Sequence, residues 1–354
     1  MTNPTTDQIN AWATDKNGPV ALHFHQELLP VEGRGEVFFP PTFAFRDAHT
    51  HYNIDTLQDG TKVCLVDSVG SQANRMEPLF LEEHLKGLVP DITVAYGDET
   101  KETDGIYSLL EAGHRLGDAI VRCTELKDDA QKAFKTFLRK GDATELAKLS
   151  PTSLVFGVWD SRDTMAKIPR ILQSTIRAWD VSKLTRSAQF NPALDYAELD
   201  IFSADEKKKA EDGKSPVAGR GFGHVPAAES HGGIVAHGVI RRDVTLNLIA
   251  LRRFRGPNSD ALKQYVLALA LLAATETTDP FLRQGCLLVP DVDAPAKWES
   301  VGRNGVRSDV NFESDALLNY AKDKANHFGV GEARHVKFDK KLAQEDLKHA
   351  KKEK

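Results

Sequence analysis

The chain has 354 residues, of which 41% are hydrophobic, so it can bury the core of one large domain or of two small ones. Its formal net charge of −5 at pH 7 excludes a uniformly basic nucleic-acid-binding protein, because the field of the whole chain does not attract a polyanion. The three cysteines lack the paired spacing of a zinc site or a disulfide framework, which favours the reducing cytoplasm. The longest apolar run, Tyr265–Ala274, is far shorter than the ~20 residues of a membrane span, and the amino terminus lacks a secretion-signal pattern. We therefore expect a cytoplasmic protein with no membrane partner.

The first part of the sequence predicts short strands and one helix. Residues 20–25 alternate apolar and polar side chains, as a half-buried strand does, and residues 37–39 are a second candidate strand. Residues 61–66 predict a strand that leads directly into a helix over Ser68–Phe80.

This predicted helix has two contrasting faces. Asp67 and Ser68 can cap its amino end, because their side-chain oxygens accept hydrogen bonds from free backbone N–H groups. An apolar stripe recurs at helical spacing through Val69, Ala73, Met76 and Phe80. The other face carries hydroxyl, amide and guanidinium groups instead of the usual Lys and Glu: Ser68, Ser71, Gln72, Asn74 and Arg75. Such groups suit the phosphates, riboses and base edges of a nucleic acid, although a partly buried polar network would use the same residues.

The middle of the chain predicts helices around one central strand. Residues 98–150 have helical periodicity and are expected to form a helical insertion. The apolar run at 153–159 is typical of a buried strand, and residues 169–179 are expected to form a helix after it. A row of cations on that helix would suit phosphate binding, as it also suits an ordinary surface helix. The residues expected to share this face, at helical spacing, are Lys167, Arg170, Ser174 and Arg177.

Residues 203–233 are rich in glycine, lysine and proline and show no periodicity. They predict either a flexible surface loop or a mobile arm between strands at 199–202 and 234–251. Within this segment Gly219–Gly223 could let backbone amides approach phosphate and leave Phe222 free to stack on a base. It is not a P-loop, because no Gly-Lys-Ser/Thr follows.

Arginines flank the buried run at 244–251 at both ends: Arg241, Arg242, Arg252, Arg253 and Arg255. A guanidinium group can bind phosphate through two parallel hydrogen bonds. They could instead form salt bridges with the acidic segment 91–129.

Residues 260–275 and 313–327 predict helices, and residues 337–354 predict a polar, lysine-rich tail. The uneven alternation of strands and helices predicts one α+β domain over residues 1–354, with a ferredoxin-like palm and large insertions.

Several segments resemble, in the same order, a known family of RNA-binding proteins. They are similar to the RAMP-type (Cas7-like) backbone subunits of type I CRISPR surveillance (Cascade) complexes, closest to the branch called type I-U or I-G. The resemblance implies a hand-like, RRM-like palm with fingers and a thumb. The matching segments are Phe38–Ala44, Cys64–Glu77 and Phe156–Ser161, followed by Lys167, Arg170 and Ser174, then His231–Gly233 and Thr245–Arg252.

The resemblance also implies a non-catalytic subunit that polymerises along CRISPR guide RNA (crRNA) without a cofactor or metal. Copies would stack head to tail in an open filament beside other CRISPR effector subunits, leaving the guide to pair with target DNA. The guide backbone would contact Ser71, Gln72, Asn74 and Arg75; an electrostatic track would comprise Lys167, Arg170, Arg241, Arg242 and Arg252; and a thumb within 203–233 would contribute Arg220, Phe222 and His224.

Two enzymatic alternatives are weaker. His49-Thr-His51 has the H-x-H pattern of metal-dependent amidohydrolases, but no barrel strand precedes it. Relatives in type III complexes cut target RNA with an acidic residue, whereas the type I branch binds without cutting, so we do not expect catalysis. The further ligands for a hydrolase would be His224, His231 and His237, and the acidic candidates for RNA cleavage are Asp67, Asp160 and Asp163.

Overall fold

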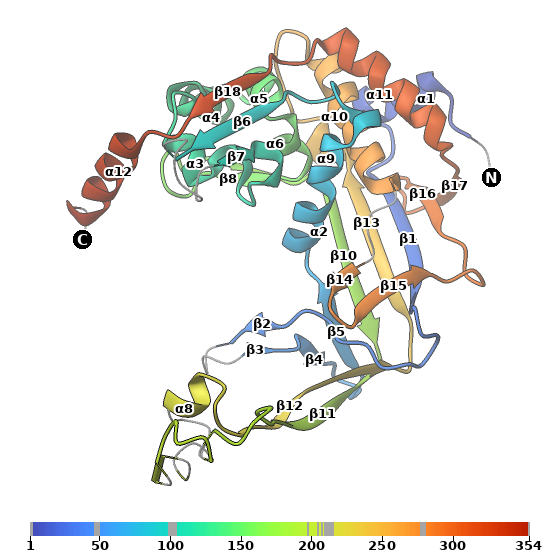
Figure 1. The fold of residues 1–354 in the computed structure, drawn as a ribbon. Coiled ribbons are helices and arrows are strands. Elements are labelled where there is room, and N and C mark those ends of the chain that lie inside the picture. Colours follow the sequence, from blue (N-terminus) through green and yellow to red (C-terminus); the bar gives the residue numbers. More distant parts are fainter. Residues whose placement is uncertain are drawn as a thin grey trace.

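The computed structural model describes a C-shaped molecule (Figure 1). A central sheet forms the back of the C, a lobe projects from one end, and a hairpin arm projects from the other. The described residues are 3–45, 50–97, 105–196, 198–203, 205–206, 208, 216–276 and 281–352.

The central sheet contains a ferredoxin-like palm. Along the chain the palm reads strand, helix, strand, strand, helix, strand, and its strands pair antiparallel in the order β15-β1-β13-β10. The α+β class expected from the sequence is therefore confirmed. The six elements are β1 (Ala21–Pro30), α2 (Val69–Met76), β10 (Leu172–Trp179), β13 (Ile240–Asn247), α10 (Ser259–Thr275) and β15 (Cys286–Pro290).

Further strands extend the palm at both edges. On one side β5 and β4 continue the sheet beyond β10, and on the other β14 pairs with β15 while β16 pairs with β1 and β17. Two short strands, β2 and β3, pair with each other near the base of the arm. The bounds are β2 (Phe43–Ala44), β3 (Thr50–His51), β4 (Ile54–Thr56), β5 (Lys62–Asp67), β14 (Phe281–Arg283), β16 (Lys297–Val301) and β17 (Arg307–Val310).

The main core lies between the sheet and its helices. Every second residue of β13 is buried, as in a strand covered on one face, and α10 is buried over nearly its whole length. The helices that pack against α10 include α1 (Thr6–Thr14), α9 (Leu248–Leu251) and α11 (Ser314–Phe328). Within the described ranges, none of the helices is long and apolar enough to cross a membrane.

The lobe is inserted between α2 and β10. Its small sheet has the order β18-β6-β7, and β18 comes from the far end of the chain to pair parallel with β6. The remaining lobe elements are short helices and one two-stranded hairpin, β8–β9. The bounds are η1 (Glu77–Leu81), η2 (Glu83–Leu85), β6 (Ile92–Tyr96), β7 (Gly105–Ser108), η3 (Leu109–Glu111), η4 (Arg115–Gly117), α3 (Ala119–Arg122), α4 (Lys127–Lys140), α5 (Thr144–Leu149), α6 (Pro151–Val155), β8 (Val158–Trp159), β9 (Lys167–Ile168) and β18 (Arg334–Lys337).

The arm is a long antiparallel hairpin between β10 and β13. Its strands are β11 (Val181–Phe190) and β12 (Val225–Ala236), and a short helix, α8 (Pro216–Gly219), lies near its end. The segment expected as a loop at 203–233 therefore includes most of a paired strand, β12, and residues 204, 207 and 209–215 lie outside the described residues. At the carboxyl end, α12 (Lys340–Lys352) projects from the lobe where a polar tail was expected.

Several element predictions are confirmed and others are wrong, including the end of the strand expected at 234–251, where α9 occupies Leu248–Leu251. The strands at 20–25 and 61–66, the helix starting at Ser68, and the helices at 260–275 and 313–327 are all present. The predicted helix at 169–179 is instead β10, because β-branched residues and buried Leu172, Ser174, Ile176 and Ala178 alternate as they do in a strand. The run at 153–159 is split between α6 and β8, and residues 199–202 form turns and bends. In addition, residues 37–39 contribute one isolated bridge from Phe38 to Ile234.

Candidate nucleic-acid interface

The amino end of α2 follows directly from the palm strand β5. Ser68 caps the helix, because its Oγ accepts a hydrogen bond from the Ser71 backbone N–H at 3.2 Å. The Ser68 hydroxyl also donates to the Ser71 hydroxyl at 3.2 Å. Both serines remain partly accessible and Asn74 is exposed, so this part of the helix presents hydrogen-bonding groups to solvent.

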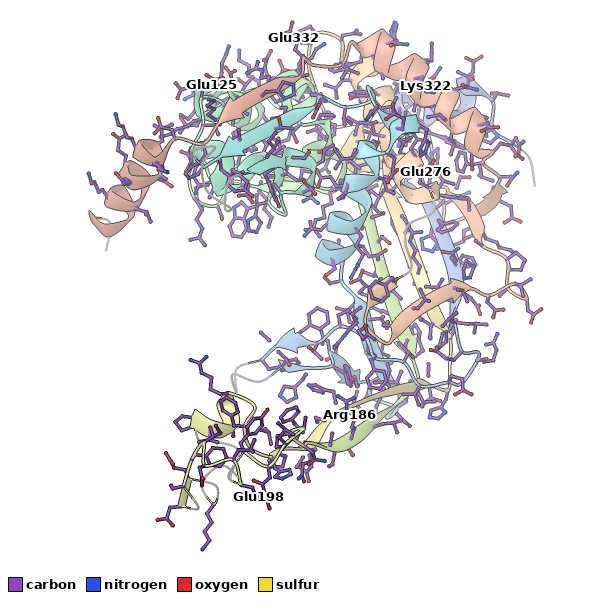
Figure 2. The ribbon with its side chains drawn as sticks, in the orientation of Figure 1. Glu125, Arg186, Glu198, Glu276, Lys322 and Glu332 are labelled. Carbon is purple, nitrogen blue, oxygen red and sulfur yellow. The ribbon has the colours of Figure 1, made fainter. Side chains whose placement is uncertain are left out.

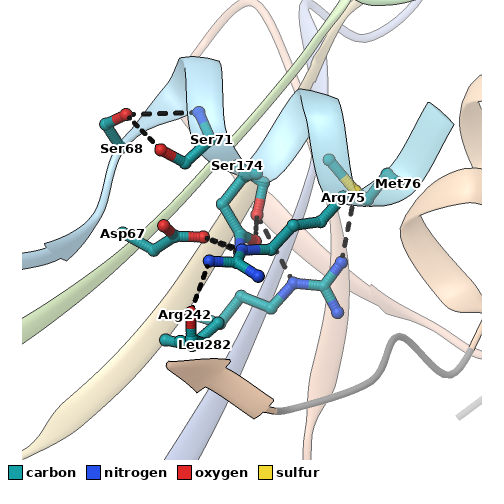
Figure 3. Close-up of polar contacts among 9 residues, drawn as sticks. Asp67, Ser68, Ser71, Arg75, Met76, Ser174, Arg242 and Leu282 are labelled. Atoms are coloured by element: carbon teal, nitrogen blue, oxygen red, sulfur yellow. Dashed lines mark hydrogen bonds and ion pairs between the residues drawn. The ribbon is translucent and has the colours of Figure 1, made fainter. Parts of the chain in front are cut away.

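A buried polar network fixes α2 to the sheet (Figure 3). The Asp67 carboxylate is 1% exposed, and its Oδ2 accepts from Gln72 Nε2 at 2.7 Å and from Arg75 Nε at 3.0 Å. Arg75 also donates to the carbonyl oxygen of Leu282 on β14. Ser174 on β10 donates to Gln72 Oε1 at 2.7 Å. Gln72 therefore fixes the helix to the sheet and is too buried to contact a ligand. Arg75 is only half-buried, so it can both fix the helix and contact a ligand.

Arg242 lies inside the protein and not on an outward track. It occupies one of the buried alternate positions of β13 and is 6% exposed. Its guanidinium donates to Ser174 Oγ, Met76 Sδ and the carbonyl oxygen of Ala274, at the carboxyl end of α10 (Figure 3 shows the first two). Burial lowers the pKa of Arg242 to about 10, and the negative end of the α10 dipole favours the cation there. Arg242 and Arg75 both line a cavity of about 180 Å³.

The other predicted cations are divided among separate places. Arg252 donates twice to the carbonyl oxygen of Trp12, and Arg241 forms an ion pair with Asp243 at 3.0 Å. Lys167 lies exposed on β9, and Arg170 lies partly buried in the connection to β10. Ser174 and Arg177 lie on opposite faces of β10, so the expected cationic helix face does not exist.

Arg115, which sequence reasoning missed, links α2 to the lobe. Its guanidinium donates to Asn74 Oδ1 at 3.4 Å and to the Gly157 carbonyl oxygen at 3.2 Å. Burial lowers the pKa of Arg115, the Glu77 charge opposes this effect, and the nearby charge of Arg170 adds to it. The Arg115 Nε lies 2.6 Å from Glu77 Oε2, and both side chains are almost completely buried. This buried ion pair brings Asn74, Arg170 and the β8 strand into one region. No local pattern in the sequence indicated it.

The Glu77–Arg115 pair gives a testable pH dependence. Burial raises the pKa of Glu77 from 4.5 to about 7, against the opposing effects of the Arg115 charge and a Thr152 hydrogen bond. Because the pKa of this carboxyl is higher in the folded than in the unfolded chain, its protonated form stabilises the fold below about pH 4.5, and this contribution is lost as the pH rises toward 7. Glu77→Gln should therefore flatten the fall in unfolding free energy between pH 5 and 8, as measured by urea unfolding of both proteins across this range. A difference between the two proteins that is independent of pH would contradict this assignment.

The three predicted thumb residues lie together near the end of the arm. Phe222 packs edge-on against Tyr196 with ring centroids 4.9 Å apart, and the His224 ring nitrogen Nδ1 is 2.8 Å from Asn191 Oδ1. Arg220 is exposed beside them. The end of the arm thus presents aromatic and basic groups far from α2 (Figure 1).

The residues of the enzymatic alternatives have structural partners. His49 lies outside the described residues, and His51 packs against Phe45 and His231. Thr164 donates to Asp160 Oδ2 through its backbone N–H and its hydroxyl, and Gln131 donates to Asp163. Across the described ranges, no group of three or more His, Cys, Asp or Glu side chains is placed to hold a metal ion.

Both signs of charge occur along the C. In Figure 2, Glu125 and Glu332 lie on the edge of the lobe away from the arm, while Arg186 and Glu198 lie on the arm. The β8–β9 hairpin likewise carries both exposed Lys167 and exposed Asp163. Neither the arm nor this hairpin is therefore uniformly basic.

Part of the chain is similar to one known protein family. Residues 22–183, from β1 to the start of β11, match the model of a family described as "CRISPR-associated protein GSU0053". One solved structure described as a "CRISPR RNA-guided surveillance complex, pre-nicking" aligns with a TM-score of 0.33 and 11% identity, over 93% of this chain and 99% of that chain. No curated protein matches the sequence.

Proposed function

We propose that this chain is a Cas7-like protein that binds guide RNA as the backbone subunit of a type I surveillance complex, because residues 22–183 match the model of a CRISPR-associated family. The observation that carries the proposal is the family match, since it spans β1, α2, the lobe without β18, and β10 in one continuous segment. The partners would be crRNA, further copies of the chain and other subunits of the complex. Target DNA would be recognised through the guide.

The geometry of α2 supports this proposal. Its buried side is fixed by the Asp67 network, so the helix does not need to reorganise when it binds a ligand. Its accessible side carries Ser71, Asn74 and the partly exposed Arg75, which can donate to phosphate and ribose oxygens. Together with Lys167 and Arg170 they form the guide-backbone contacts that we propose.

We also propose that the subunit binds without cutting and polymerises head to tail. The Asp67 carboxylate holds α2, and Asp160 holds the loop of the β8–β9 hairpin, so each has a structural task already. The arm projects away from the palm, as an element that contacts a neighbouring copy would, and this supports an open filament. Incubation with complementary RNA and Mg²⁺ should leave that RNA intact.

Arg75→Ala should weaken guide-RNA binding and lower the dependence of affinity on salt. Loss of one phosphate contact reduces the slope of log K against log salt by about 0.7 for a single strand. Because Arg75 also pairs with Asp67, the variant loses stability as well, so its affinity must be measured below its unfolding transition. Gln72→Ala is the matched control, because it removes the other Asp67 donor but no charge. An Arg75→Ala salt slope equal to that of the wild type would exclude this arginine from the interface.

The proposal as a whole is tested by sequencing the nucleic acid that copurifies with the chain from its native cells. RNAs of one length class, each joining a unique spacer to a constant repeat-derived handle, are the expected result. Copurification without such RNA, or with RNA of random sequence and length, would contradict the proposed function.

A further inference from the structure

Trp159 is exposed in a way that its structural surroundings do not explain. Its side chain is 55% accessible, whereas Trp12 and Trp298 are 5% and 6% accessible and Trp179 is partly buried. A large aromatic side chain is stabilised when a ligand covers it, and Trp159 also has the cation Lys167 beside its ring. We propose that Trp159 is a stacking platform for an unpaired base of single-stranded nucleic acid. This inference rests on the proposed function and deepens it.

The first argument is that the backbone that carries the indole is held in place before any ligand arrives. Trp159 ends β8, whose neighbouring residue Val158 is buried in the lobe and pairs with buried Ile168 on β9. The hairpin is closed by the hydrogen bond from the Asp160 N–H to the Ala166 carbonyl. A base that stacks on such a side chain costs little conformational entropy in the protein.

The second argument concerns the loop that joins β8 to β9. The buried Asp160 carboxylate accepts from the Thr164 N–H at 2.8 Å and from the Thr164 hydroxyl at 2.6 Å. These bonds fold the loop back on itself beneath the tryptophan strand. The acidic side chain nearest in sequence to Trp159 is thus turned inward and does not repel a phosphate at the surface.

The third argument is the charge beside the ring. Lys167 stands directly opposite Trp159 in the β8–β9 pair, and its Nζ lies 5.6 Å from the centre of the indole ring. Arg162 is exposed on the same hairpin, and the only other acid of this loop, Asp163, accepts a hydrogen bond from Gln131. An aromatic surface bordered by cations fits a nucleotide, whose base stacks while its phosphate meets the charge. An apolar protein segment would not need these cations.

The fourth argument is position. The Arg115 guanidinium contacts both Asn74 on α2 and the Gly157 carbonyl, two residues before Trp159. In Figure 1, β8 lies on the edge of the lobe that faces the arm. A strand that runs along α2 therefore passes close to Trp159, so that one nucleic acid can use both surfaces.

The test compares a base-bearing strand with a strand that lacks bases. Full-length wild-type protein, Trp159→Ala and Trp159→Phe are titrated with single-stranded poly(A) and with an abasic ribose-phosphate polymer of equal length. Trp159→Ala should bind poly(A) about 5- to 100-fold more weakly, Trp159→Phe should recover most of this loss, and all three proteins should bind the abasic polymer equally. Intrinsic fluorescence of the wild type should be quenched by poly(A), and Trp159→Phe should lack this quenching.

A matched control separates stacking from loss of any exposed apolar group. Ile106→Ala truncates another side chain of the lobe, 73% exposed on β7, and should bind poly(A) as the wild type does. Unchanged poly(A) affinity in Trp159→Ala would overturn the stacking assignment while leaving the proposed function standing, even if that variant failed to assemble with other subunits. An equal loss on the abasic polymer would also overturn it. Failure of the wild type to bind either polymer would overturn both.

Discussion

Arg115→Ala is expected to lower the free energy of unfolding by about 3 to 5 kcal/mol, because it leaves the buried Glu77 carboxylate without its partner. The two side chains are 4% and 2% exposed, so water cannot replace the lost guanidinium. The substitution also removes the hydrogen bonds to Asn74 and Gly157. Urea unfolding of the purified variant measures the loss directly.

Two further variants decide whether burial causes this loss. Arg334→Ala removes an equally close ion pair of the same lobe, with Asp129 at 2.6 Å, but both of those side chains are well exposed. It should cost no more than about 1 kcal/mol. Combining Glu77→Gln with Arg115→Ala removes the unpaired charge and should recover part of the stability. If Arg115→Ala were no more harmful than Arg334→Ala, the pair would not connect the lobe to α2 energetically.

Arg115 also has a backbone conformation that arginine rarely adopts. Its φ of +52° lies in the left-handed region, where every residue except glycine has an unfavourable backbone free energy. The surrounding contacts compensate for that cost, because they direct the guanidinium between α2 and β8. A variant at this position is therefore expected to disturb the alignment of Asn74 and Trp159 as well as the stability of the lobe.

The parts of the fold that sequence reasoning predicted correctly are locally determined. A cap and an apolar stripe predicted α2, and an unbroken apolar segment predicted α10, because each signal lies within its own element. The helix predicted at β10 is wrong because the spacing of its cations fits one face of a helix, whereas its buried residues alternate with the period of two that a strand has. Short apolar segments support either assignment, and pairing with β5 and β13 decides between them.

The parts that could not be predicted depend on contacts between distant segments. The pairing of β18 with β6 joins residues near 335 to residues near 93, and no local pattern in either strand names its partner. Arg242 looked like a surface cation in a basic cluster, yet alternation along β13 turns it toward Met76 and α10. The composition of the sequence indicated the end of the arm, but the pairing of strand β11 with strand β12 could not be predicted from it.

Removing the arm is expected to abolish cooperative loading of guide RNA while leaving the palm folded. Residues 187–229 are replaced by Asn-Gly, a two-residue turn that joins the paired residues Arg186 and Ser230. The contacts at the base of the arm are kept, namely His231 to the Thr50 carbonyl and the Gly233 N–H to the Tyr52 hydroxyl. If the arm contacts a neighbouring copy, as we propose, affinity for a long guide should fall by about 100-fold or more, as when linked sites lose their avidity.

The control for this experiment separates assembly from RNA contact. An RNA that holds a single copy should bind the shortened protein about as tightly as the wild type, because α2 and the lobe are unchanged. Removal of residues 340–354 eliminates α12, another projecting element, and should leave loading of the long guide intact. Nuclease digestion of the loaded guide gives the second readout: regular protection with the wild type and irregular protection without the arm. Regular, cooperative protection by the shortened protein would mean that copies contact one another through the palm or the lobe, because those are the surfaces that the variant retains.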